Sequence, residues 1–188
     1  YKANISIKYK KVFKNPELII ACTNDEKKLE ELFSDNRVEY RWYLGHEKIL
    51  NFENFTIRKV TIEGQELNLL KKEETGRGLE FFIEIPDKRH LLNKTVEFYL
   101  EFETIHPKHE TEFPVYIVHP TKGLEVEFNY NQTEINDPRI FTFFAGKDRY
   151  PEIKKEKGII NVKTESDDWI FPNSGILIYW HKSITKED

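Results

Sequence analysis

The feature of this chain that most constrains its fold is an alternation of apolar and polar residues with a period of two, which recurs along most of its length. In TVEFYLEFE (95–103), Val96, Phe98, Leu100 and Phe102 fall on one side, and mostly glutamates lie between them. Successive side chains of a β-strand point to opposite faces, so this pattern predicts strands with one buried and one solvated face. Nine further segments have strand-like patterns of this kind: 37–44, 55–64, 78–86, 112–118, 123–130, 139–146, 158–164, 167–172 and 175–180.

About nine or ten short strands with turn residues between them predict a mostly β fold, an antiparallel β-sandwich or a barrel-like arrangement. The 188 residues form either one compact β-rich unit over 1–188 or two packed β subdomains of about 1–105 and 106–188, divided near His106-Pro107-Lys108. The chain contains no methionine and begins at YKANISIKYK, so we expect it to be a fragment of a longer protein.

One helix interrupts the alternation, in the segment TNDEKKLEELF (23–33). Thr23 and Glu26 have the spacing of a capping box, and Leu29, Leu32 and Phe33 fall on one face at helical spacing. The pattern predicts one short helix from about 24 to 34, which covers an edge or end of a sheet through its apolar face.

Charge and composition argue against several classes of function. The 29 Lys and Arg residues against 33 Asp and Glu residues give a net charge of −4, which disfavours a dedicated binder of nucleic acid polymers. The single cysteine, Cys22, lies in the apolar run LIIAC, so we expect no internal disulfide and a reducing, cytoplasmic location. No segment reaches the roughly 20 apolar residues that span a bilayer, so we expect no transmembrane segment in this piece, with membrane anchorage of a longer protein as the alternative.

Motifs for catalysis and metal binding are weak. His106 and His109 in HPKHE, with Glu110 beside them, are two near neighbours in a proline-containing loop, whereas a metal site needs three or four ligands. Ser174 lies in PNSGI, which lacks the Gly-x-Ser-x-Gly pattern of a nucleophile elbow. We therefore expect no enzymatic activity, no metal and no cofactor.

The stretch WIFPNSGILIYW (169–180) has two interpretations. Pro172 and Gly175 are turn residues, so the stretch predicts a hairpin between two apolar runs. The second run is apolar on both faces, which carry Ile176, Ile178 and Trp180 on one side and Leu177 and Tyr179 on the other. One interpretation is core packing, or cover by another part of a longer protein, and the other is a surface formed by Trp169 and Trp180 that stacks on a base or a sugar.

Three short stretches combine cations with glycine or aromatic residues. Arg77 lies in GRG (76–78), Lys122 lies in HPTKG (119–123), and KYKKVFK (8–14) interleaves lysines with aromatic residues. Glycine lets backbone amides approach an anion and a cation supplies charge, so these stretches are candidate phosphate contacts. For KYKKVFK, the alternative is a solvated edge strand that its lysines protect against aggregation.

The first functional hypothesis is a non-enzymatic regulatory or sensor domain of a larger bacterial signalling protein, which binds a small ligand such as a nucleotide second messenger. Its predicted ligand site has aromatic side chains that stack on the ring and cations that meet the phosphates: Trp42, Trp169, Tyr179 and Trp180, and Arg77, Lys122 and Arg149.

The alternatives are a protein-binding or adhesion-like sandwich and a carbohydrate-binding module. A nucleotide sensor requires a cation close to an exposed aromatic side chain, whereas a sugar binder requires aromatic side chains in a row with acidic or amide groups beside them. An interaction sandwich requires an exposed apolar patch or an open edge strand.

Overall fold

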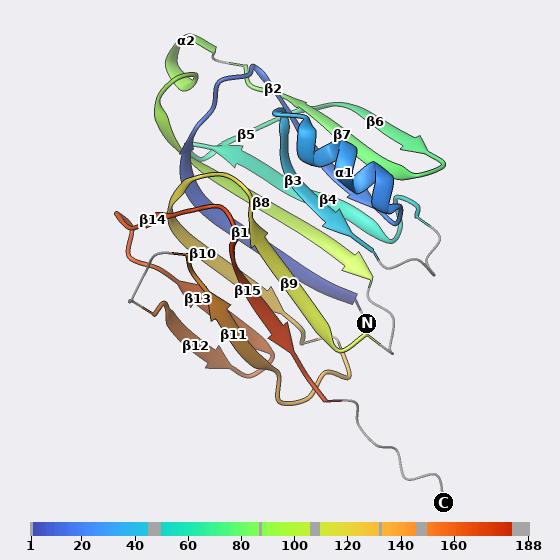
Figure 1. Cartoon of the computed structure of the whole chain (residues 1–188), viewed down its shortest axis with the longest axis vertical. Coiled ribbons are helices and arrows are strands. Elements are labelled where there is room, and N and C mark those ends of the chain that lie inside the picture. The colour runs from blue at the N-terminus through green and yellow to red at the C-terminus, as the bar shows by residue number, and fades with distance from the viewer. Residues whose placement is uncertain are drawn as a thin grey trace, which may run out of the picture. The chain divides into compact units, whose positions relative to one another are not determined.

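A computed structural model describes residues 2–44, 50–86, 88–105, 110–131, 133–145 and 150–181 (Figure 1). These residues form fifteen strands and two short helices. Nine strand pairs among these residues are antiparallel and one is parallel. Buried aromatic rings join strands of different sheets. The structure therefore confirms the mostly β, sandwich-like fold that the alternation predicts.

The chain divides into two compact units, one formed by residues 1–9 and 105–188 and the other by residues 10–104. We call them unit 1 and unit 2. Strand β1 (Lys2–Val12) runs through the division, with residues 2–9 in unit 1 and residues 10–12 in unit 2. No helix among the described residues is long and apolar enough to cross a membrane.

Unit 2 contains one sheet of order β8-β4-β5 and another of order β3-β2-β7-β6. Their elements are β2 (Glu17–Thr23), α1 (Glu26–Ser34), β3 (Val38–Tyr43), β4 (Phe55–Ile62), β5 (Gln65–Glu66), β6 (Leu69–Thr75), β7 (Gly78–Glu84), α2 (Lys88–Leu91) and β8 (Thr95–Ile105). Buried aromatic rings fill the space between the two sheets, since Phe55 of β4 lies 5.8 Å from Phe81 of β7, and Phe102 of β8 lies 5.8 Å from Trp42 of β3.

Strands β2 and β3 form a parallel pair, which the sequence pattern did not predict. Helix α1 connects them, as a crossover between parallel strands requires. Helix α1 lies against these strands (Figure 1). Its Leu32 packs with Ile19, Ala21 and Val38 of the sheet. The position of the helix was correctly predicted, but its predicted apolar face was not, since Leu32 is buried whereas Phe33 is 59% exposed. The N-cap is Asp25 rather than Thr23, because the Asp25 carboxylate accepts a hydrogen bond from the Lys28 amide at 2.7 Å.

Unit 1 contains a sheet of order β12-β13-β10-β1, with β14 paired to β10, and a three-stranded sheet of order β11-β15-β9. The strands are β9 (Glu112–Ile117), β10 (Thr121–Asn129), β11 (Arg139–Phe143), β12 (Glu152–Glu156), β13 (Ile159–Lys163), β14 (Trp169–Ile170) and β15 (Ser174–Tyr179). Phe128 of β10 lies 5.1 Å from Phe113 of β9 and 6.4 Å from Trp180, so these rings join the two layers.

The predicted hairpin at Pro172 is wrong. Strand β14 pairs with β10 in one sheet, whereas β15 pairs with β9 and β11 in the other. The chain therefore crosses between the layers of unit 1 at Pro172 and Asn173, and the positive φ of 66° at Asn173 turns it. The turn residues were identified correctly, but local turn chemistry does not specify which strand becomes the hydrogen-bonding partner.

Two further strands differ from what the sequence pattern suggests. The segment Glu152–Glu156 is not among the strand-like segments of the sequence, yet it is a strand whose five residues are all exposed. It is held by backbone pairing with β13 rather than by an apolar face. The KYKKVFK segment lies in β1, which stands between β10 and β8 in the strand order, so it is not an edge strand.

Candidate binding face on the three-stranded sheet

The outward side of the sheet β11-β15-β9 is an apolar surface. Cross-strand partners in an antiparallel sheet point to the same face, so the strand registers define three rows on this side. The rows are Arg139–Tyr179–Glu112, Phe141–Leu177–Pro114 and Phe143–Gly175–Tyr116. We call these nine positions the outer face. Six of them are large apolar or aromatic residues, one is glycine, and the two charged residues lie in the same row.

Aromatic contacts organise the outer face. The ring of Phe143 lies 6.2 Å from that of Phe141 and 6.1 Å from that of Tyr116, between ring centroids. Phe143 covers Gly175 on the middle strand, since a Cβ added there would lie 2.6 Å from the Phe143 ring. Phe141 and Tyr116 nevertheless remain 56% and 59% exposed, so the rings form a continuous strip that solvent reaches.

The opposite layer of unit 1 gives a direct comparison. On β10, β13 and β12 the equivalent outward rows are Glu125–Lys163–Glu152, Glu127–Asn161–Lys154 and Asn129–Ile159–Glu156. Six of these nine positions are charged and one is apolar. Ion pairs form among them, at 3.4 Å between Lys163 Nζ and Glu125 Oε2 and at 3.0 Å between Lys154 Nζ and Glu152 Oε1. That layer has an ordinary solvated face, whereas the outer face of the three-stranded sheet does not.

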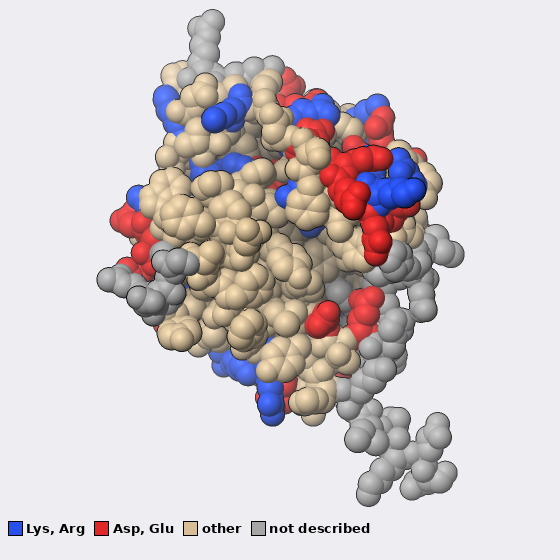
Figure 2. Space-filling view, viewed as in Figure 1, with Lys and Arg blue, Asp and Glu red and all other residues tan. Residues whose placement is uncertain are grey.

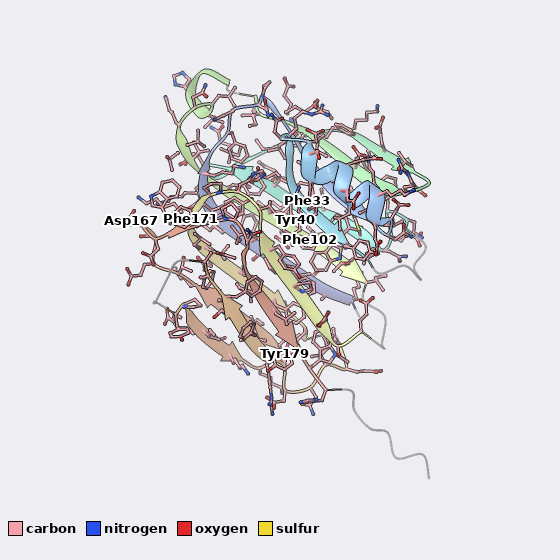
Figure 3. The ribbon with its side chains drawn as sticks, in the orientation of Figure 1. Phe33, Tyr40, Phe102, Asp167, Phe171 and Tyr179 are labelled. Atoms are coloured by element: carbon pink, nitrogen blue, oxygen red, sulfur yellow. The ribbon has the colours of Figure 1, made fainter. Side chains whose placement is uncertain are left out.

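Figure 2 shows a broad uncharged surface over the part of the view in which Figure 1 labels β9, β11 and β15. Charged side chains gather mainly around its margin. Tyr179, labelled in Figure 3, marks the end of β15 at which Arg139 and Glu112 lie on the two flanking strands.

Of the predicted ligand residues, Trp42 and Trp180 are buried, with 3% and 4% of their surface exposed. Trp42 packs against Tyr40 and Phe102, and the latter two are labelled in Figure 3. Burial, with the neighbouring Cys22 as a smaller cause, raises the pKa of Tyr40 far above its ordinary value, so its hydroxyl stays protonated. These aromatic rings fill the core and do not face solvent.

Lys122 and Trp169 are cross-strand partners in the β10–β14 pair, and Trp169 is 45% exposed. Lys122 Nζ lies 2.9 Å from the carboxylate of Asp167, which Figure 3 labels together with Phe171. The glycine of the HPTKG stretch has a structural role: Gly123 has a φ of 61°, and a Cβ there would lie 2.8 Å from the Ser166 carbonyl oxygen. The structure thus places a cation beside a half-exposed aromatic ring, with a carboxylate already bound to the cation.

Arg77 lies in unit 2, in the turn between β6 and β7. Its guanidinium Nη2 donates to Glu31 of α1 at 3.1 Å, and Nη1 lies 3.9 Å from the Asp25 carboxylate. These acidic groups supply the counter-charge that a phosphate would otherwise provide. Arg149 lies outside the described residues, as does the His106/His109 pair.

A cavity of about 490 Å³ opens in unit 1, and none of the six predicted ligand residues that the structure describes lines it. Its lining combines two aromatic rings with hydroxyl groups, one lysine and three acids: Phe144, Tyr150, Pro151, Glu152, Lys163, Thr164, Glu165, Ser166, Asp168 and Ile170. Tyr150 is 90% exposed. The excess of carboxylates opposes a phosphate ligand and suits a neutral polar one. The described part of the chain holds no group of three or more His, Cys, Asp or Glu side chains arranged for a metal ion.

The residues of the outer face were not predicted as a site, apart from Tyr179. The sequence did contain an indication of this face. The segments 112–117, 139–143 and 175–179 each carry apolar residues at both odd and even positions, and therefore on both faces of a strand. A strand that is apolar on both faces needs cover on both sides. The sequence could not show that these three segments are neighbours in one sheet. Comparisons of this chain with models of protein families, with curated proteins and with solved structures find no match.

Proposed function

We propose that this chain is a non-enzymatic interaction module that binds a protein partner through the outer face of the β9-β15-β11 sheet. The observation that carries the proposal is the pair of outward faces in unit 1, one mostly charged and the other mostly apolar. Soluble monomers rarely expose a contiguous apolar patch of this kind, and such patches with polar margins mark sites of interaction with proteins.

The residues of the outer face suit this role. Tyr and Phe are enriched at protein interfaces because a rigid ring buries a large area at a small cost in side-chain entropy. Three neighbouring strands hold the rings of Tyr116, Phe141 and Phe143 in fixed positions, so a partner binds a surface that is already ordered. This arrangement supports the protein-binding alternative more directly than the nucleotide-sensor hypothesis.

A photo-crosslinking experiment tests the proposal. The photoreactive amino acid p-benzoylphenylalanine replaces Tyr116 on the outer face or, as the matched control, Lys154 on the charged face of unit 1. Cells that produce the protein are irradiated, and adducts are identified by mass spectrometry. We expect a discrete protein adduct from position 116, none of the same mass from position 154, and loss of the adduct when Phe141→Asp is added to the chain.

The absence of any adduct at position 116, or the same adducts from both positions, would overturn the proposal. The Phe141→Asp variant is suitable because the Phe141 side chain is more than half exposed, so its replacement leaves the buried core unchanged. A circular dichroism melt of each variant separates loss of binding from loss of folding.

A small neutral ligand such as a sugar is the second candidate, on the strength of the cavity at Tyr150. A thermal-shift panel of nucleotides, oligosaccharides and divalent metals separates it from the sensor hypothesis. A ligand that binds only the native state stabilises it by about 2.7 kcal/mol at a hundredfold excess over its dissociation constant. A shift with oligosaccharides that Tyr150→Ala abolishes supports the cavity as a site, and a shift with nucleotides alone supports the sensor.

A further inference from the structure

We infer that the partner of the outer face is a second copy of this chain, packed face to face about a two-fold axis that runs along β15. The inference rests on the proposed function, because it names the occupant of the same surface. Its evidence is the position of the two charged residues among the nine outer-face positions.

Arg139 and Glu112 occupy the same row, on opposite sides of the middle strand, with Tyr179 between them. A two-fold axis that lies in the interface and follows β15 exchanges the two flanking strands and keeps each row in register. Arg139 then faces Glu112 of the second copy, and Glu112 faces Arg139 of the second copy. An isologous interface repeats each contact twice, so both charges of both chains find partners of opposite sign.

The remaining rows are compatible with the same axis. Leu177 meets its own symmetry mate at the centre, Phe141 faces Pro114, and the Phe143 ring faces Tyr116. Aromatic and aliphatic side chains thus fill the middle, and the charged row closes one end. Two sheets that pack face to face lie about 10 Å apart, with their strands within about 30° of each other. The side chains of Arg139 and Glu112 are long enough to meet across this spacing at the margin of the interface.

An axis across the strands is less favourable. It would place the row of Arg139 and Glu112 against the row of Phe143 and Tyr116 of the second copy. Both charges would then lose solvent without gaining a partner of opposite sign, which costs free energy. The charge pattern therefore selects the axis along β15.

The size of the face sets the expected strength of the dimer. Three strands of five or six residues give a footprint of about 15 Å by 17 Å from standard strand spacings. An interface of this size lies below the roughly 1,200 Å² of total buried area that is usual for stable complexes, so we expect a reversible dimer that forms with rising concentration.

Sedimentation equilibrium of the purified chain, with two charge reversals, tests the inference. The apparent mass of the wild-type protein is expected to rise from the 22.6 kDa of one chain towards twice that mass as concentration increases. Glu112→Arg places two arginines opposite each other, and Arg139→Glu places two glutamates opposite each other. Each variant alone is expected to dimerise about tenfold more weakly than the wild type, because attraction becomes repulsion at both ends of the row.

An equimolar mixture of the two variants is the decisive sample. In the heterodimer every arginine at position 112 or 139 faces a glutamate, so association is expected to return to the wild-type level. Both positions are exposed, and melting curves verify that each variant is folded. A mixture that associates no better than either variant alone would overturn the inference, as would a wild-type chain that stays monomeric at millimolar concentration.

The crosslinking experiment keeps the two proposals distinguishable. An adduct from position 116 to the same chain supports both of them. A monomeric wild-type chain with an adduct to a different protein contradicts the second copy and leaves the proposed function standing. A monomeric chain with no adduct contradicts both.

Discussion

Lys11 and Glu39 are charged residues in the interior of unit 2, and their burial makes them energetically important. Lys11 Nζ lies 2.6 Å from Glu39 Oε2, and the two side chains are 10% and 4% exposed. The ammonium group also lies 4.9 Å from the centre of the Phe13 ring. Alternation along KYKKVFK places Lys11 on the same side as Tyr9 and Phe13, and that side is buried.

Replacement of Lys11 by methionine is expected to destabilise the chain by about 3–5 kcal/mol, because the Glu39 carboxylate stays buried without this cation. Urea unfolding measures the loss. The double variant Lys11→Met with Glu39→Leu is expected to lose clearly less, since both charges are removed together. Lys10→Met, on the opposite side of β1, is the control and should change stability by less than about 0.5 kcal/mol. Equal losses for the single and double variants would contradict this account.

The sequence singled out four aromatic residues as candidates for a ligand site, but it did not show which of them are buried and which are exposed. Trp42 and Trp180 fill cores, Trp169 is half exposed, and Tyr179 lies on the outer face. All four occur in strand-like segments, so their local patterns are similar. Whether the covering layer lies on one side of a strand or on both depends on strands that are distant in sequence, and that information is not local.

Strand β15 is the element on which the candidate site depends, and Gly175 is its most constrained position. A Cβ at this position would lie 2.5 Å from the Val115 carbonyl oxygen and 2.6 Å from the Phe143 ring. Both neighbours belong to strands that pair with β15, so neither contact is relieved by movement of β15 alone. The glycine therefore allows Phe143 to lie across the middle strand.

Gly175→Ala is expected to cost about 1–3 kcal/mol by overpacking and to displace the Phe143 ring from the outer face. Thermal or urea unfolding measures the cost, and self-association in the ultracentrifuge should weaken in the same variant. Gly76→Ala is the matched control, because a Cβ at Gly76 meets nothing within 4 Å. If the Gly175→Ala chain is as stable and self-associates as strongly as the control, the claim that Val115 and the Phe143 ring leave no room for a Cβ at position 175 is contradicted.

The elements also show the limits of local patterns. Helical spacing predicted α1, and alternation predicted amphipathic strands such as β8 and β10, although no strand was predicted over β2, β6 or residues 2–7 of β1. The alternation missed β12, whose only apolar residue is the exposed Ile153, because that strand is formed by backbone pairing with β13. It also missed the parallel pairing of β2 with β3, since nothing local in a strand states its direction relative to a neighbour.

For the molecule as a whole, the continuous strand β1 belongs to both units, because the division falls between its residues 9 and 10. A strand that belongs to both units cannot be lost from one without disturbing the other, so we expect the units to unfold together. Trp42 reports on unit 2 and Trp180 on unit 1, and both are buried. Two variants are made, one that retains Trp42 and one that retains Trp180 as its single tryptophan. Within each variant, the urea midpoint from tryptophan fluorescence should equal the midpoint from far-ultraviolet circular dichroism.

The comparison is made within each variant, because replacement of a buried tryptophan itself lowers stability. Fluorescence and circular dichroism midpoints that differ in either variant would show that the units unfold separately.

The amino-acid sequence is sufficient to specify the β class, the one longer helix and the apolar side of each strictly alternating strand, because these follow from the side-chain periods of strands and helices. Sheet membership, the crossing at Pro172 and the outer face of β9-β15-β11 depend on which strands become neighbours. Strand pairing joins segments far apart in the chain, so its free energy comes from contacts between whole strands and not from any local pattern. For that reason the doubly apolar strands were visible in the sequence, whereas the surface that they form together was not.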